Sequence, residues 1–179
     1  YLMREGRVET NPFSGLPQPK KQRNLPRILS PEEVVRLLET PRRLADAKDT
    51  TSPLLRYQPL RDTAVLEVLY SGGLRISELT GLREERVDLV AGVVRVLGKG
   101  NKERICPLGD PAVAALHAAM EAREDFLLEL GVSPRPPELF LNKNGGPISH
   151  RSLQRMMKRM LREAGLPGDL YPHALRHSF

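Results

Sequence analysis

The stretch Leu69-Tyr-Ser-Gly-Gly-Leu-Arg-Ile-Ser-Glu-Leu-Thr-Gly-Leu82 contains a pair of glycines between two apolar segments. Apolar residues recur at helical spacing over residues 60–71, which predicts a helix that runs into this stretch. Gly72-Gly73 is expected to end that helix, because glycine readily adopts the backbone conformations found after a last helical turn. A second, short helix is predicted from there through Leu82. Arg75 then lies where the second helix begins.

Downstream, two strand-like runs at residues 92–97 and 103–108 flank the turn Gly98-Lys-Gly-Asn-Lys102, which predicts a β-hairpin. A long helix is predicted over residues 110–130. A short apolar run and a turn follow, and Ser149 is expected to cap a last long helix that ends near Gly165. The predicted fold class is mainly α with a small antiparallel β-sheet (α+β).

Upstream, Ser30-Pro31-Glu32-Glu33 is a capping box with proline at the first helical position, which predicts a helix through about Glu39. Residues 41–58 are polar and are interpreted as a loop. Residues 11–31 hold five prolines and a basic cluster, and are expected to form an extended linker. Residues 1 to about 10 are interpreted as the end of a helix. The predicted domain division is therefore 1–22 and 23–179.

The composition favours a polyanionic partner. Lys and Arg number 28 against 22 Asp and Glu, and most of the basic residues are arginine, which suits bidentate contact with phosphate. A GC-rich genome or a heat-adapted host would also enrich arginine. The single cysteine, Cys106, excludes an internal disulfide framework, fits a reducing cytoplasm and is expected to be a buried strand residue. No apolar run has membrane-spanning length and no signal peptide is visible, so a cytoplasmic protein is predicted.

Four cationic or ionisable side chains form a candidate catalytic set for phosphodiester chemistry without metal: Arg75, Lys99, His173 and Arg176. Each has an ordinary alternative. Arg75 and Glu78 could be a surface ion pair, Lys99 a solvated turn lysine, and His173-x-x-Arg176 a core histidine beside a surface arginine. No His, Cys or Asp spacing indicates a metal site, and no cofactor is predicted.

The last predicted helix has two faces. An apolar stripe is expected to be core and comprises Leu153, Met156, Met157, Met160, Leu161 and Ala164. Beside it runs a basic stripe, interpreted as a nucleic-acid contact in preference to a solvated face. The DNA-binding candidates are Arg151, Arg155, Lys158 and Arg159 on this helix, with Lys102 and Arg104 at the hairpin.

Together, the segments Leu69–Leu82, Val93–Arg104 and His173–Phe179 resemble the tyrosine recombinase (phage integrase) family, and within it the Xer-type enzymes. The resemblance covers residues from about 25 to 179. It implies the family's catalytic-domain fold over 23–179, with residues 1–22 as the tail of a core-binding domain and its linker. Arg75 corresponds to the first catalytic arginine, Lys99 to the hairpin general acid, and His173 and Arg176 to the His-x-x-Arg pair. Glu78 and His177 would support them.

In such enzymes a tyrosine attacks the scissile phosphate and forms a 3′-phosphotyrosyl intermediate, with no metal or cofactor. The implied partners are a double-stranded DNA recombination site and a homo- or heterotetramer of recombinase protomers. Chromosome dimer resolution, linked to chromosome partition and cell division, is the first expectation. Integration of a mobile element, a non-catalytic DNA-binding regulator and a type IB topoisomerase are the alternatives.

One departure from the family pattern concerns the nucleophile. The family's tyrosine lies downstream of His-x-x-Arg, and none of Tyr1, Tyr57, Tyr70 and Tyr171 matches its position. The first residue is also not methionine. We therefore expect the chain to be a piece of a longer protein, lacking C-terminal helices, that binds DNA without cleaving it and is monomeric without DNA.

Overall fold

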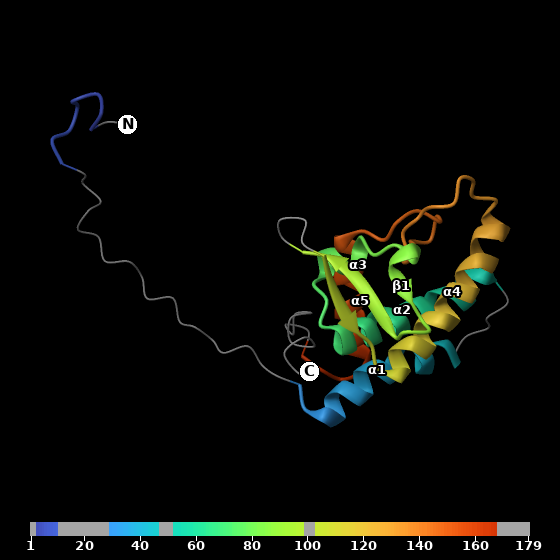
Figure 1. Cartoon of the computed structure of the whole chain (residues 1–179). Helices are drawn as coiled ribbons and strands as arrows, with labels where there is room; N and C mark the ends of the chain where they lie inside the picture. The colour runs from blue at the N-terminus through green and yellow to red at the C-terminus, as the bar shows by residue number, and fades with distance from the viewer. Residues whose placement is uncertain (1–2, 11–28, 47–51, 99–102, 168–179) are drawn as a thin grey trace.

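The computed structural model describes residues 3–10, 29–46, 52–98 and 103–167. Within these ranges a helical domain carries one small sheet, which confirms the predicted fold class (Figure 1). The helices are α1 (Pro31–Asp46), α2 (Pro53–Gly72), α3 (Ile76–Thr80), the 3-10 turn η1 (Glu84–Arg86), α4 (Asp110–Leu130) and α5 (His150–Glu163). The strands are β1 (Val87–Asp88), β2 (Val93–Leu97) and β3 (Glu103–Pro107).

The helices share one apolar core. The α2 helix packs along α4, α1 lies against α2, and α5 contacts both α1 and α3. Figure 1 shows α4, in yellow to orange, along one side of this arrangement and α1, in blue, at the bottom of the view. Leu66 of α2, Leu116 of α4 and Leu153 of α5 are fully buried in that core. The apolar stripe predicted on α5 is buried as expected.

The sheet is antiparallel in the order β1-β2-β3. In the β2–β3 hairpin, Val94 pairs with Cys106 and Val96 pairs with Arg104. Burial alternates along both strands, so these four residues lie on the inner face. This confirms the predicted hairpin and the buried Cys106. Strand β1 was not expected, because two residues are too short to produce a periodic signal.

The predicted loop over residues 41–58 is wrong at both ends. The α1 helix continues to Asp46 and α2 begins at Pro53. Arg43 of α1 donates a hydrogen bond of 2.6 Å to the carbonyl of Glu163, which ties the extra turn to α5. Ser52 caps α2 by accepting from the backbone N–H of Leu55. Residues 47–51 lie outside the described residues.

The interpretation of the first residues as a helix end is also wrong for residues 3–10, which form turns. Gly6 has φ of 65° and its N–H bonds the carbonyl of Met3, so the backbone leaves any right-handed helical path there. The predicted linker falls almost entirely on residues 11–28, outside the described residues. The domain division therefore stays a prediction.

Tyr57 belongs to the smaller of two apolar clusters and is almost fully buried. Its ring stacks on Phe126 with centroids 5.0 Å apart. Its hydroxyl accepts a 2.9 Å hydrogen bond from the backbone N–H of Leu141. This tyrosine therefore holds the chain segment before α5 against α2 and α4.

Replacing Tyr57 with Phe removes only the hydroxyl and leaves the buried N–H of Leu141 without its acceptor. We expect the free energy of unfolding to fall by about 1–3 kcal/mol. Tyr70→Phe is the matched control, because no described residue bonds that half-buried hydroxyl, and it should change stability little. Chemical denaturation of both variants measures the difference, and equal stabilities would contradict this role for Tyr57.

Candidate active site

The junction between α2 and α3 determines where Arg75 lies. Gly73 ends α2 in the left-handed region, with φ of 54°. Leu74 then inserts into the core and is 2% exposed. Arg75 follows in an extended conformation as the residue before α3, and its carbonyl accepts the N–H of Leu79. The buried leucine on one side and the helix on the other leave the Arg75 side chain at the surface.

Glu78 binds Arg75 twice. One carboxylate oxygen accepts the backbone N–H of Arg75 at 2.7 Å, and the other accepts its Nη1 at 2.9 Å. Glu78 thus caps α3 and orients the guanidinium at once. Glu78 therefore holds the Arg75 side chain, whereas its part in catalysis stays a prediction.

The same carboxylate also binds Arg104 of β3. Arg104 donates from Nη1 and Nη2 to the two oxygens of Glu78, at 2.6 and 2.8 Å. Each oxygen therefore accepts two hydrogen bonds, and the Glu78 side chain is only 4% exposed. Burial by itself would raise the pKa of Glu78. The hydrogen bonds from Arg104, then those from Arg75, hold that pKa at about 2.

Two guanidiniums around one ionised carboxylate leave a net positive charge at this point of the surface. The Arg75 side chain is 52% exposed, and no described residue other than Glu78 accepts a hydrogen bond from its guanidinium. Its remaining N–H groups can therefore bind an anion. A phosphate oxygen matches that charge and that fork of donors.

The other members of the predicted catalytic set lie outside the described residues. They are Lys99, His173 and Arg176, together with the supporting His177 and the DNA-binding candidate Lys102. What the structure does describe is the position of the two strands that flank Lys99. Since β3 begins beside Glu78, the hairpin lies on the Arg75 side of the domain. That the four predicted catalytic side chains converge on one site stays a prediction.

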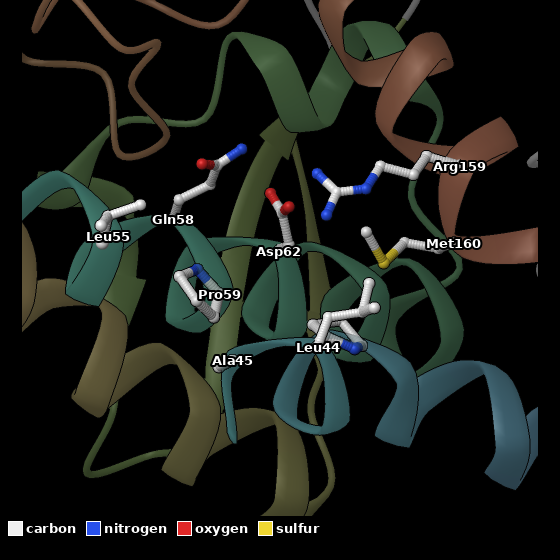
Figure 2. Close-up of a pocket in the computed structure, with 9 residues that line it drawn as sticks. Leu44, Ala45, Leu55, Gln58, Pro59, Asp62, Arg159 and Met160 are labelled. Atoms are coloured by element: carbon white, nitrogen blue, oxygen red, sulfur yellow. The ribbon is translucent and has the colours of Figure 1, made fainter. Parts of the chain in front are cut away.

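The α5 helix presents most of its predicted cations to solvent. Arg151, Arg155 and Lys158 are exposed, whereas Arg159 is half-buried. Figure 2 shows the Arg159 guanidinium directed towards the Asp62 carboxylate, with the Gln58 side chain beyond it. Arg159 also lines the pocket drawn there, next to apolar residues of α1 and α2. It is therefore less available to an external ligand than the other three.

Asp62 forms a buried ion pair with Arg61 that the sequence analysis did not single out. Arg61 donates from Nε and Nη2 to one oxygen of Asp62, at 2.9 and 2.6 Å, and from Nη1 to the carbonyl of Leu141. Burial raises the pKa of Asp62, and the nearby positive charges of Arg61 and Arg159 partly oppose this. The sequence signal for this buried ion pair was the adjacent arginine and aspartate within an apolar helical stripe.

A cavity of about 470 Å³ lies between α2, the turn at residues 142–147 and α5. Basic side chains that line it include Lys143 of the turn and Arg155 and Arg159 of α5. Lys143 is exposed and was not among the predicted DNA-binding residues. Its position in a Gly-rich turn just before a basic helix could have identified it as a candidate DNA-binding residue.

Over the described ranges, no three His, Cys, Asp or Glu side chains gather as a metal site. None of the helices described is both long and apolar enough to cross a membrane.

Comparison with known proteins identifies the family. The phage integrase family matches residues 27–179 of this chain, which include the Arg75 site, the hairpin and α5. The chain belongs to this family. Tyrosine recombinase XerC from Actinobacillus pleuropneumoniae serotype 7 (strain AP76) is 41% identical over all 179 residues and 53% of its own length. The chain thus spans about half the length of the curated relatives it matches.

Solved structures of recombinases share the fold of this chain. A crystal structure of XerA recombinase superposes with a TM-score of 0.67 and 27% identity, over 86% of this chain and 49% of that one. XerH site-specific recombinase bound to difH substrate superposes with a TM-score of 0.62 and 24% identity, over 87% of this chain and 42% of that one. These matches confirm the catalytic-domain fold predicted from the sequence.

The Glu78 carboxylate makes stability depend on pH. The pKa of Glu78 is lower in the folded than in the unfolded chain. Its contribution to stability is therefore complete at pH values above the ordinary glutamate pKa of 4.5, and it is lost as the pH falls towards 2. At neutral pH a depression of this size corresponds to roughly 3 kcal/mol. We expect the stability difference between the native chain and Glu78→Gln to shrink as pH falls from about 4.5 to 2.

Denaturant titrations of the two proteins at several pH values measure this difference. Glu85→Gln is the control, because Glu85 is exposed and its one ion pair with a described residue, Arg83, is 3.6 Å long. A Glu78→Gln difference that stays constant over the acidic range would contradict the proposed charge network.

Proposed function

We propose that this chain is the main part of the catalytic domain of a Xer-type site-specific recombinase. The full protein cuts and rejoins DNA strands through a 3′-phosphotyrosyl intermediate. The observation that carries the proposal is the Arg75 guanidinium, held by Glu78 with its free donors exposed, within a chain of the phage integrase family. The 41% identity to a XerC recombinase favours the Xer type.

The proposed reaction follows from charge. A tyrosine oxygen, from a residue beyond the matched motifs, attacks the scissile phosphorus and displaces the 5′ oxygen of the next nucleotide. Arg75 and Arg176, with His173, stabilise the negative charge that develops on the phosphoryl oxygens. Lys99 gives its proton to the departing 5′ oxygen. The 5′-hydroxyl of the partner strand then attacks the phosphotyrosine, which re-forms a phosphodiester and releases the tyrosine.

The DNA-binding surface is proposed to run along α5. Of its exposed cations, Arg155 lines the basic cavity together with Lys143 of the preceding turn, and α5 packs on α3, which follows Arg75. A duplex lying on α5 therefore brings its backbone near the Arg75 site. Since bases and phosphates are both accessible in the major groove, a basic helix can contact either.

We propose chromosome dimer resolution in the cytoplasm over mobile-element integration, because the similarity to XerC recombinases favours the Xer type. Both processes use the same chemistry. The active assembly is proposed to be a tetramer of recombinase protomers on two DNA sites, either identical or of two kinds. A regulator that only binds DNA would share the α5 surface but would not need the free donors of Arg75.

A suicide duplex nicked beside the scissile phosphate tests the catalytic part. The protein encoded by the whole gene should become covalently trapped on it through a tyrosine. Arg75→Lys keeps the charge but loses the fork of donors, so we expect trapping to fall by about 100-fold or more while DNA binding changes little. Gel analysis under denaturing conditions measures trapping. Equal trapping by the native protein and Arg75→Lys would refute the assignment of Arg75.

Binding of duplex DNA by this chain tests the α5 surface. Arg151→Gln and Lys158→Gln should each weaken binding and reduce the slope of log K against log salt by about 1 per lost phosphate contact. Arg135→Gln is the matched control, since Arg135 is exposed in the loop that follows α4 and is paired with Glu124 of α4. Fluorescence anisotropy at several salt concentrations gives both quantities. Slopes that fall equally in all three variants would argue against a specific α5 surface.

A further inference from the structure

We infer that Arg104 is a positioning residue of the catalytic site, and not the phosphate contact that its place beside the hairpin turn indicates. It joins the strand next to Lys99 to Arg75 through the shared Glu78 carboxylate. This inference rests on the proposed function, because it assigns Arg104 a part in the same strand cleavage.

The strand register directs Arg104 inward. It pairs with the buried Val96, and it shares its face of β3 with the buried Cys106. Its neighbours Glu103 and Ile105 point the other way and are exposed. A side chain on the inner face of the hairpin reaches α3, and the Arg104 side chain is 36% exposed against 52% for Arg75.

The contact itself is a bidentate ion pair with a carboxylate that is almost fully buried. Two parallel hydrogen bonds determine both distance and orientation, which a single bond does not. An exposed arginine available to phosphate would have its donors in water. Here both terminal nitrogens of Arg104 are engaged with Glu78.

Sharing the carboxylate also determines the net charge of the cluster formed by Arg75, Glu78 and Arg104. With Arg104 present, one negative charge is divided between two guanidiniums and the cluster keeps a net positive charge. Without Arg104, Glu78 would neutralise Arg75 alone, and the attraction of Arg75 for a phosphoryl oxygen would weaken. Arg104 thus acts on the reaction through Arg75, without touching the DNA.

Arg104 also links two parts of the site that are distant in sequence. It is the second residue of β3, so the turn that bears Lys99 lies only a few residues before it. Holding β3 to α3 through Glu78 limits how far the base of that turn can move from Arg75. Displacements of about 1 Å in a catalytic group can cost about 100-fold in rate.

The test compares cleavage with binding, using the whole-gene protein and a nicked suicide duplex. In Arg104→Gln, single-turnover cleavage at saturating DNA should fall by about 10-fold to 100-fold. The DNA dissociation constant and its salt slope should stay close to those of the native protein. Arg104→Lys keeps the charge but only one hydrogen bond, so its cleavage rate should lie between those of the native protein and Arg104→Gln. It replaces Arg104→Gln in the test if the glutamine variant folds poorly.

Two further variants sharpen the result. Arg86→Gln is the matched control, since Arg86 forms an ion pair with the exposed Glu103, the residue before Arg104, and donates no hydrogen bond to Glu78 among the described residues. It should cleave at the native rate. If both residues act through one contact, the double variant Glu78→Gln/Arg104→Gln should cleave no more slowly than Glu78→Gln alone.

Three outcomes would overturn the inference. Cleavage by Arg104→Gln at the native rate would remove the positioning role. A loss confined to DNA affinity, with the salt slope reduced by about 1, would make Arg104 a phosphate contact. Absence of any covalent product with the unaltered protein would overturn the proposed function and this inference with it, whereas the first two outcomes leave the proposed function intact.

Discussion

The shared carboxylate of Glu78 is the contact on which the rest of the site depends. It caps α3, orients Arg75 and holds β3 through Arg104, so one side chain joins a helix start, an exposed guanidinium and a strand. A nearly buried carboxylate would be costly alone, but four hydrogen bonds from two arginines offset that cost. The result is a rigid support that leaves one positive charge facing outward.

The helical core explains why that support is stable in position. Leu74, which precedes Arg75 in the chain, is buried in the core, and α4 packs along α2. The α5 helix packs on α3 and so carries its exposed cations close to the same site. The proposed DNA-binding surface and the proposed catalytic site are therefore neighbouring surfaces of one packed unit. The Arg159 guanidinium is directed towards the buried Asp62 and not towards solvent.

Local patterns predicted the parts of the fold that local physics decides. Gly73 ends α2, Ser149 caps α5, and the two strands of the hairpin were predicted within one residue. The first seven residues of α2, 53–59, were missed, although Ser52-Pro53 repeats the Ser-Pro start of α1. The missed end of α1, residues 40–46, is different, because its contact with the end of α5 spans more than a hundred residues and no local sequence pattern predicts it.

By itself, the sequence determined the family, the fold class and the pairing of Arg75 with Glu78, because motifs, periodicity and a three-residue spacing are all local properties. Only the tertiary structure decided that Arg104 faces Glu78 and that Arg159 turns towards Asp62. A sequence shows that a residue is positive, but not which carboxylate lies within its reach. That depends on how strand, helix and core pack together, and packing brings together residues that no sequence spacing relates.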